Sequence, residues 1–297
     1  MASHVKILKD KGLIQPPKWL PNNIIFEGMT GSIAYNVSND SSDIDLIGFC
    51  MPPKEVLFPH LAGEISGFGT QSPRFEQFQQ HHIVSPEKTR TYDITIYNIV
   101  KFFQLAMENN PNMVDAVFLP RRCILYSNEI YEIMRENRKL FLHKGCWHKF
   151  RGYAYSQIHK MKTGANKANH KRQESIEKFG YDVKFGYHVV RLVLECEQIL
   201  VEHDLDIERN SEILKSIRRG EWALPQLEDW FAKKEKSLEE VYHSSTLQYV
   251  PDEAAIKSVL MECLEAWYGD NLFQSQVIAI PQDNLVNEML KLLEKYK

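Results

Sequence analysis

Apolar residues in the first hundred positions recur in short runs of the strand type. "NNIIFEGMTG", ending at Gly31, and "SDIDLIGFCM", with period-two alternation, predict two strands. The segments "FEQFQQHHIV" and "TRTYDITIYN" flank the turn-forming "SPEK", which predicts a hairpin. Between the first two strands, residues 32–42 leave room for a short helix and a turn.

After Ile96 the apolar residues change to helical spacing. A helix over 98–109 is stopped by "NPN", and Asn112, with Asp115, is expected to cap the next one. Further helices are predicted over 128–141, 147–162, 184–203, 211–220, 224–243, 252–267 and 282–296. The pattern predicts an α+β fold, with a small mixed β-sheet domain over residues 1–122 followed by a mainly helical domain over residues 123–297.

Composition is that of an ordinary globular protein, with 43% hydrophobic and 25% charged residues among 297. Because no apolar run approaches the roughly 18 residues of a membrane span, and the start lacks a secretory signal, a cytoplasmic protein is expected. The five cysteines are scattered and form no C-x-x-C, so neither a disulfide framework nor a zinc site is indicated, and buried reduced thiols are expected.

Charge is unevenly distributed. The chain carries a net charge of -3, yet the segment 144–191 holds eleven Lys and Arg against three acids. Such a basic segment suggests a surface that faces a polyanion. A solvated helix face, balanced by acids from elsewhere in the fold, explains it equally well, and composition leaves both interpretations open.

Two aspartates stand inside the second apolar run. In a strand, Asp43 and Asp45 project from one face while Ile44 and Leu46 project from the other. Paired carboxylates repel each other and resist desolvation, so a bound cation explains them, and oxygen ligands favour Mg²⁺ or Mn²⁺. The alternative is that both lie on the solvent face of an edge strand.

A Gly-Ser pair precedes these aspartates. Placed where a helix begins after a strand, Gly31 and Ser32 would offer backbone N–H groups and a hydroxyl to phosphate oxygens. A phosphate clamp beside a cation site predicts a metal–nucleotide substrate.

The pattern "TGS", ten residues, then "DIDL" resembles the DNA polymerase beta-type nucleotidyltransferase superfamily. The resemblance implies a third carboxylate on a neighbouring strand, and "TYDITIY" supplies Asp93, which could instead be a polar residue that opens a strand. It also implies that Asp43, Asp45 and Asp93 are catalytic residues that bind the metal ions.

Further segments resemble the RNA-repair-associated (YcgL/RlaP-like) branch of that superfamily. They include "GYAYSQIHKM", "YDVKFGYHVVRLV" and "IRRGEW", and the resemblance covers roughly residues 24–225. Relatives commonly read "GSRAYG" where this chain has Ile33 and Asn36, so a substrate contact by a basic side chain there is lost.

One helix carries a row of charged residues. Lys184, His188, Arg191 and Glu195 share a face, and the resemblance implies that the first three face the cleft and hold a triphosphate or an RNA phosphate. A solvated helix face remains the alternative. Adjacent His81 and His82 are expected to point to opposite faces of a strand and receive no role.

The function implied is metal-dependent transfer of a nucleoside monophosphate from a nucleoside triphosphate to an acceptor hydroxyl. Asp43 and Asp45 would bridge two ions and Asp93 would complete the site of one. The basic segment and the resemblance favour an RNA 3′ end as acceptor. A protein-modifying nucleotidyltransferase and an RNA-binding protein without catalysis are the alternatives, and the number of subunits is left open.

Overall fold

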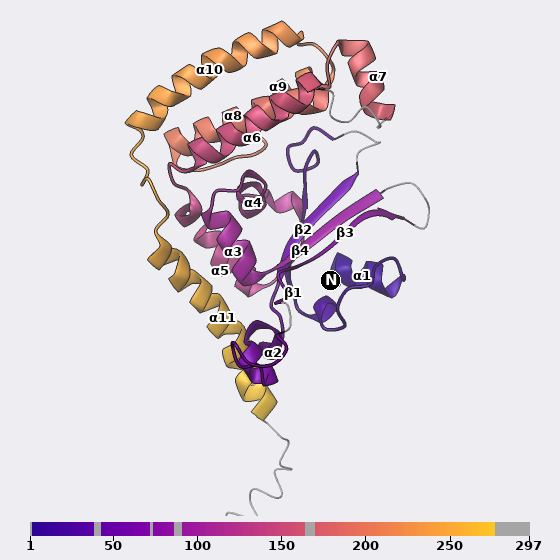
Figure 1. The fold of residues 1–297 in the computed structure, drawn as a ribbon, viewed down its shortest axis with the longest axis vertical. Coiled ribbons are helices and arrows are strands. Elements are labelled where there is room, and N and C mark those ends of the chain that lie inside the picture. Colours follow the sequence, from indigo (N-terminus) through magenta and orange to yellow (C-terminus); the bar gives the residue numbers. More distant parts are fainter. Residues whose placement is uncertain (1, 39–42, 72–73, 86–90, 164–169, 277–297) are drawn as a thin grey trace, which may run out of the picture.

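The structure is a computed structural model that describes residues 2–38, 43–71, 74–85, 91–163 and 170–276. It confirms the α+β prediction, with a mixed sheet beside a large helical part (Figure 1). The strand order in the sheet is β3 (Gln77–Val84), β4 (Thr91–Asn98), β2 (Ile44–Cys50), β1 (Ile24–Thr30), β5 (Ile124–Ser127).

The predicted strands and hairpin are present. β3 and β4 are antiparallel, β2 and β4 are parallel, and β1 is antiparallel to both β2 and β5. The short β5 was not anticipated. By sequence it falls after residue 122, yet it pairs with β1 of the sheet. The division of the chain at residue 122 stays a prediction.

Most helices lie where the helical spacing predicts them. They are α3 (Ile99–Met107), α4 (Pro111–Val117), α5 (Glu129–Glu136), α6 (Cys146–Thr163), α8 (Val183–Glu202), α9 (Ser211–Arg218), α10 (Leu224–Ser244) and α11 (Glu253–Gln276). Three helices were not predicted: α1 (His4–Asp10), α2 (Lys54–Leu57) and α7 (His170–Phe179). The helix expected over 282–296 lies outside the described residues. No described helix is both long and apolar enough to span a bilayer.

The expected cap of α4 is wrong by two residues. Asn110, not Asn112, is the N-cap, and its side-chain oxygen accepts the Asn112 N–H at 3.1 Å. Pro111 then occupies the first helical position, where its missing N–H costs nothing because that N–H has no partner in the helix. Asp115 lies inside the helix and is buried, so it has a different role.

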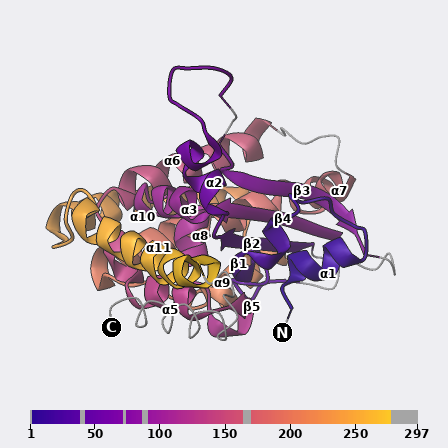
Figure 2. The ribbon, with the colours of Figure 1, turned by 90° about the horizontal axis from the view of Figure 1, so that it is seen from below.

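Both faces of the sheet are covered. Ile44, Leu46 and Ile94 belong to a smaller apolar cluster with Val5 and Leu8 of α1. The opposite face contributes to a large cluster shared with the helices, and Figures 1 and 2 show α1 on the other side of the strands from α3 and α8. The alternation along β2 therefore places Asp45 on the helical side of the sheet.

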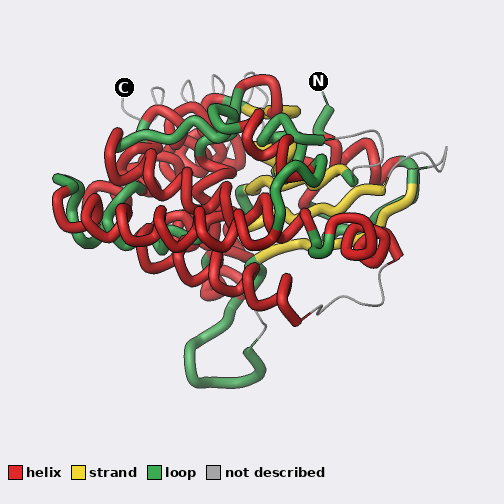
Figure 3. The backbone as a smooth tube through the Cα atoms, turned by 90° about the horizontal axis from the view of Figure 1, so that it is seen from above, coloured by secondary structure: helices red, strands yellow, loops and turns green. Residues whose placement is uncertain are grey.

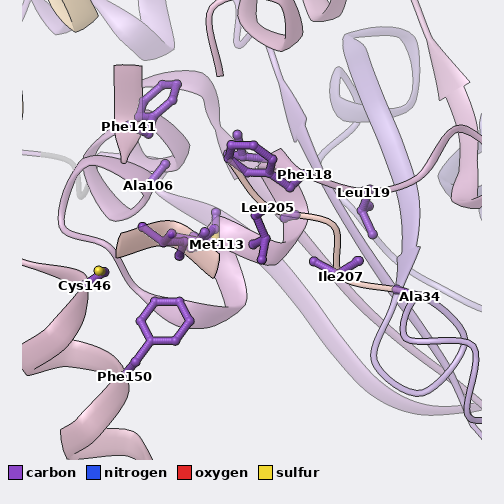
Figure 4. Packing of buried hydrophobic residues seen from close by; sticks show 14 of the residues in the cluster. Ala34, Ala106, Met113, Phe118, Leu119, Phe141, Cys146, Phe150, Leu205 and Ile207 are labelled. Carbon is purple, nitrogen blue, oxygen red and sulfur yellow. The ribbon is translucent and has the colours of Figure 1, made fainter. Parts of the chain in front are cut away.

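Aromatic rings fix the sheet to the helical part. Phe26 of β1 stacks on Tyr131 of α5 with ring centroids 4.3 Å apart, and Phe49 of β2 lies 4.9 Å from Phe102 of α3. Burying each such ring stabilises the fold by roughly 1.5–3 kcal/mol. Figure 4 shows Met113 of α4 within the same cluster, and the tube in Figure 3 shows the helices packed along the strands. All five cysteines are buried and free, as expected for reduced thiols.

Candidate active site

Two carboxylates lie side by side at the start of the parallel strands. The register of β2 and β4 pairs Asp45 with Asp93, so their side chains leave the same face of the sheet. Asp43 immediately precedes β2 and is exposed. Parallel pairing of two strands that are far apart in sequence thus brings together the aspartates that the motif singles out.

Gly31 lies directly against one of these carboxylates. It has a φ of 64°, and a Cβ built on it would lie 2.4 Å from Oδ2 of Asp45. Only glycine satisfies both the left-handed conformation and this close approach. The Gly-Ser segment and the aspartate pair therefore form one site.

The electrostatics of Asp45 show that its charge is poorly compensated. Its pKa is raised to about 6, chiefly by burial; Lys184 lowers this pKa, and the neighbouring Asp93 and Asp43 raise it. Lys184 is exposed at the start of α8, close enough to Asp45 to lower the pKa of that carboxyl group. A cation close to Asp45 would relieve this unfavourable charge.

Asp93 is held by a β-bulge that sequence reasoning missed. The register passes from Gln80–Ile94 to Ile83–Tyr92, so two histidines stand opposite Asp93. His82, with a φ of 55°, donates its backbone N–H to Oδ1 of Asp93 at 2.7 Å. The imidazole Nδ1 of His81 lies 3.4 Å from Oδ2. The strict strand alternation expected for these histidines is therefore wrong, because the bulge inserts a residue.

The segment after β1 is a turn instead of the expected helix. Within it, Tyr35 donates its N–H to Gly31 at 3.2 Å and Val37 donates to Ser32 at 2.9 Å, after which the chain leaves the helical path. Asn36, where relatives carry glycine, adopts a φ of 55° that asparagine tolerates. In the described part of the chain, the N–H groups of Ser32 and Ile33 have no acceptor.

The charged residues along α8 differ in how deeply they are buried. Lys184 faces the site, and His188 is half-buried. Burial holds the pKa of His188 well below its usual range, as do the cations Arg191, Lys184, Arg172 and Arg218, so this imidazole is neutral. Arg172 and Arg218 were not singled out from the sequence, because they stand on other helices.

Arg191 does not face the cleft. Its side chain is 4% exposed and its guanidinium donates to Asp115 of α4 and, at 2.9 Å, to Glu195. Helical spacing correctly places it on the same face as Lys184, but α4 covers that part of the face. The expected phosphate contact by Arg191 is therefore corrected to a buried ion pair.

Comparison with known proteins assigns the chain to a family. The model of RlaP, described as the RNA repair pathway DNA polymerase beta family, matches residues 8–246. The chain belongs to the RlaP family. As an RlaP-family protein it is a polymerase beta-like nucleotidyltransferase, a family that generally uses divalent metal ions.

No curated protein matches the chain. Among solved structures, a nucleotidyltransferase-like protein from Exiguobacterium sibiricum is 10% identical, with a TM-score of 0.28. The match covers 81% of this chain and 73% of the other. A likeness at this TM-score adds nothing to the family assignment.

The donor set of this RlaP-family site fits a hard cation only in part. Among the described residues, no three His, Cys, Asp or Glu side chains are grouped as a ready-made metal site. Mg²⁺, however, is usually bound by one or two carboxylates together with substrate phosphates. Asp45 and Asp93 provide such a carboxylate pair, so the chemistry fits an ion that arrives with a nucleotide.

Four cations of the basic segment 144–191 have partners within the fold. Arg151 pairs with Glu235 of α10 at 2.6 Å, Arg172 with Asp182 at 2.9 Å, and Arg191 with Asp115 and Glu195. Lys144 is buried under the Tyr249 ring, 4.4 Å from its centroid. The interpretation that acids elsewhere balance this segment is therefore correct for Arg151 and Arg191, whereas Asp182 belongs to the segment itself and Lys144 lies against a ring. Lys149, Lys160, Lys178 and Lys184 are exposed.

Proposed function

We propose that the chain transfers a nucleoside monophosphate from a nucleoside triphosphate to the 3′ hydroxyl of an RNA. The observation that carries this proposal is the alignment of Asp45 with Asp93 on parallel strands, with Gly31 in contact with Asp45. Family membership supports nucleotidyl transfer as the reaction class.

Each residue of the site has a role in this proposal. Asp45 and Asp93, with Asp43 at the open end of β2, would hold two Mg²⁺ or Mn²⁺ ions. Such ions lower the pKa of an attacking hydroxyl and neutralise the leaving pyrophosphate. The Ser32 hydroxyl binds phosphate oxygens together with the N–H groups of Ser32 and Ile33, which have no acceptor among the described residues.

Two residues of α8 complete the phosphate side. Lys184 lies close enough to Asp45 to lower the pKa of that carboxyl, and so reaches the space that a metal-bound triphosphate would fill. His188, being neutral, donates or accepts a hydrogen bond without adding charge. Arg191 is no longer proposed as a ligand, because its guanidinium is committed to Asp115 and Glu195.

Exposed residues of α6 support RNA as the acceptor. Lys149, Tyr153 and Lys160 are spaced i, i+4 and i+11 and therefore share one face of the helix. Tyr153 is 37% exposed, which leaves part of its ring available to stack on a base. Cations along a helix with an aromatic between them suit a single-stranded RNA backbone. Another lysine of the basic segment, Lys162, has a side chain that lies outside the described residues.

The reaction is tested by offering each α-labelled nucleoside triphosphate with Mg²⁺ and total RNA, and then with total protein. We expect label on RNA, loss of labelling in EDTA, and no labelling by Asp93→Asn. The control Asp10→Asn changes an exposed aspartate at the end of α1. Label on protein alone would favour the protein-modifying alternative, and RNA binding without any labelling would favour the inactive one.

The acceptor surface is tested by RNA binding across a salt series. If Lys149 and Lys160 contact phosphates, replacing both with Ala flattens the log–log salt slope by roughly 1 to 2. Replacing exposed Lys9 and Lys11 at α1, on the other side of the sheet, is the matched control. A wild-type response that does not change with salt would remove RNA as the acceptor.

A further inference from the structure

The turn that follows β1 is held from the helical part of the molecule. Arg122 donates from its Nη2 to the carbonyl oxygens of Ile33, at 2.9 Å, and Ala34, at 3.3 Å. Arg218, at the end of α9, donates from Nη1 to the carbonyl oxygen of Val37. Carbonyl groups along the turn, which no helix continues, thus accept from guanidinium groups 88 to 181 positions away in the sequence.

A third attachment fixes the side chain at the centre of the turn. The Tyr35 hydroxyl donates to Oδ2 of Asp115 at 2.5 Å, and the Arg191 guanidinium lies 4.5 Å from the centre of the Tyr35 ring. Arg122 is itself oriented by Glu208, which accepts from its Nε at 2.7 Å. Figure 4 shows Ala34 of the turn in the same apolar cluster as Ile207, the neighbour of Glu208.

These contacts act on one side of the turn only. The carbonyl oxygens of Ile33, Ala34 and Val37 receive the arginines, whereas the N–H groups of Ser32 and Ile33 have no acceptor among the described residues. Cations at the carbonyl end of a helical turn also complement its dipole, which favours an anion at the N–H end.

We propose that Arg122 and Arg218 are positioning residues that set the turn 31–37 for phosphate binding beside Asp45. This inference rests on the proposed function, because it assigns the turn to substrate phosphate. The arginines replace the helix that the Gly-Ser motif led us to expect: they fix carbonyl groups that a following helical turn would otherwise fix. Neither side chain needs to touch the nucleotide.

The chain provides a matched control for each arginine. Arg122 follows Arg121, which pairs on the surface with Glu132 at 2.6 Å. Arg218 precedes Arg219, which pairs with Glu221 at 2.5 Å. Within each doublet, one arginine binds the turn and its neighbour binds an acid away from the turn. Replacing either member removes the same charge from nearly the same place.

The experiment measures binding of inorganic tripolyphosphate with Mg²⁺, and the KM values for nucleotide and for RNA. We expect Arg122→Ala and Arg218→Ala each to weaken tripolyphosphate binding and raise the nucleotide KM by about tenfold, the effect of losing a hydrogen bond from a charged donor. The RNA KM stays unchanged. Arg121→Ala and Arg219→Ala behave as the wild type in all three measurements.

Conservative variants separate positioning from folding. Arg218→Lys keeps the charge and one donor, so its tripolyphosphate affinity lies between wild type and Arg218→Ala. Added guanidinium ion, but not urea at the same concentration, restores binding to Arg218→Ala. If the alanine variants fail to fold, amide hydrogen exchange is measured in Arg218→Lys instead. Faster exchange confined to the turn 31–37 supports the positioning role, and unchanged exchange overturns it.

Two results would overturn the inference in different ways. If the wild type binds tripolyphosphate and the two alanine variants of each doublet bind it equally well, the positioning role is refuted and the proposed function stands. A wild type that binds no tripolyphosphate would refute the phosphate role of the turn, and the positioning role with it.

Discussion

Two groups of acids in this molecule differ in how their negative charge is compensated. Asp115 and Glu195 are buried between α4 and α8, where burial raises the pKa of both carboxyl groups, and Arg191 lies between them. Asp45 and Asp93 stand on neighbouring strands at the site, and no guanidinium among the described residues pairs with them, although Asp93 accepts the His82 N–H and lies 3.4 Å from the His81 imidazole. One cluster is compensated by an arginine inside the fold, whereas we propose that the other is compensated by a bound cation.

The difference separates a structural cluster from a candidate catalytic one. A buried charge that has its partner inside the fold contributes order, and removing the partner is costly. A pair of neighbouring carboxylates without a guanidinium partner among the described residues lowers the stability of the native state, which is typical of sites that bind cations or substrate. Both clusters touch the same turn, through Tyr35 in one case and Gly31 in the other.

The largest effect is expected at the Asp45 and Asp93 pair. Asp45→Asn should lower nucleotidyl transfer by about a thousandfold or more, over ~4 kcal/mol in the barrier, because a metal ligand is lost. Its free energy of unfolding should stay the same or rise slightly, since repulsion from Asp93 is relieved. Activity assays and urea denaturation measure the two quantities. A variant that is inactive because it is unfolded would contradict the comparison.

In the cluster of Arg191, Asp115 and Glu195, a substitution should instead lower the stability of the fold. Arg191→Met leaves two buried carboxyl groups without their cation, so the free energy of unfolding should fall by about 3–5 kcal/mol. Arg209→Met, which breaks the exposed pair with Glu202, is the control and should change little. Urea denaturation at neutral pH measures both. Equal stability of the two variants would show that Arg191 is not needed inside the fold.

Glu27 sharpens the comparison, because it is a buried acid that has only backbone partners. It is 1% exposed, accepts the N–H of Val5 at 2.9 Å and that of His4, and burial raises its pKa to about 7. A raised pKa means that the stability contributed by the protonated form is present below about pH 4.5 and is lost as the pH rises through about 7.

Glu27→Gln should therefore lose the part of the pH dependence that comes from this carboxyl group. Relative to that variant, the wild type should lose up to about 3 kcal/mol of unfolding free energy between pH 4.5 and 8. Denaturation of both proteins across the pH series measures the difference. Parallel curves would mean that α1, which holds the two amide donors, does not stay in place.

The smallest effect is expected at the phosphate turn. Ser32→Ala should weaken nucleotide binding by about tenfold, or ~1.4 kcal/mol, since the neighbouring N–H groups remain. Ser38→Ala, just beyond the turn and exposed, is the matched control. Complete loss of activity in Ser32→Ala, measured alongside it, would give the hydroxyl a task other than phosphate binding.

Local periodicity determined a large part of what the structure shows. The alternation in "SDIDLIGF" places Ile44 and Leu46 in the apolar cluster with α1, and leaves Asp45 on the other face. The helical spacing places α3, α5, α6 and α8 to α10 within about five residues of their observed limits, whereas α11 begins where predicted and runs nine residues past its predicted end. These patterns are readable because the backbone repeats every two residues in a strand and every 3.6 in a helix, whatever the partners are.

Only the tertiary structure decided which charged groups are paired. Lys184 and Arg191 are indistinguishable on one helix face, yet the first is exposed at the site and the second is enclosed by α4. The alignment of Asp45 with Asp93 depends on parallel pairing, and the hold on Asp93 depends on a bulge. The turn after Gly31 ends where it does with Arg122 and Arg218 on its carbonyl groups. All of these are contacts between segments remote in sequence, and the free energy of a charge depends on what surrounds it, which no local pattern contains.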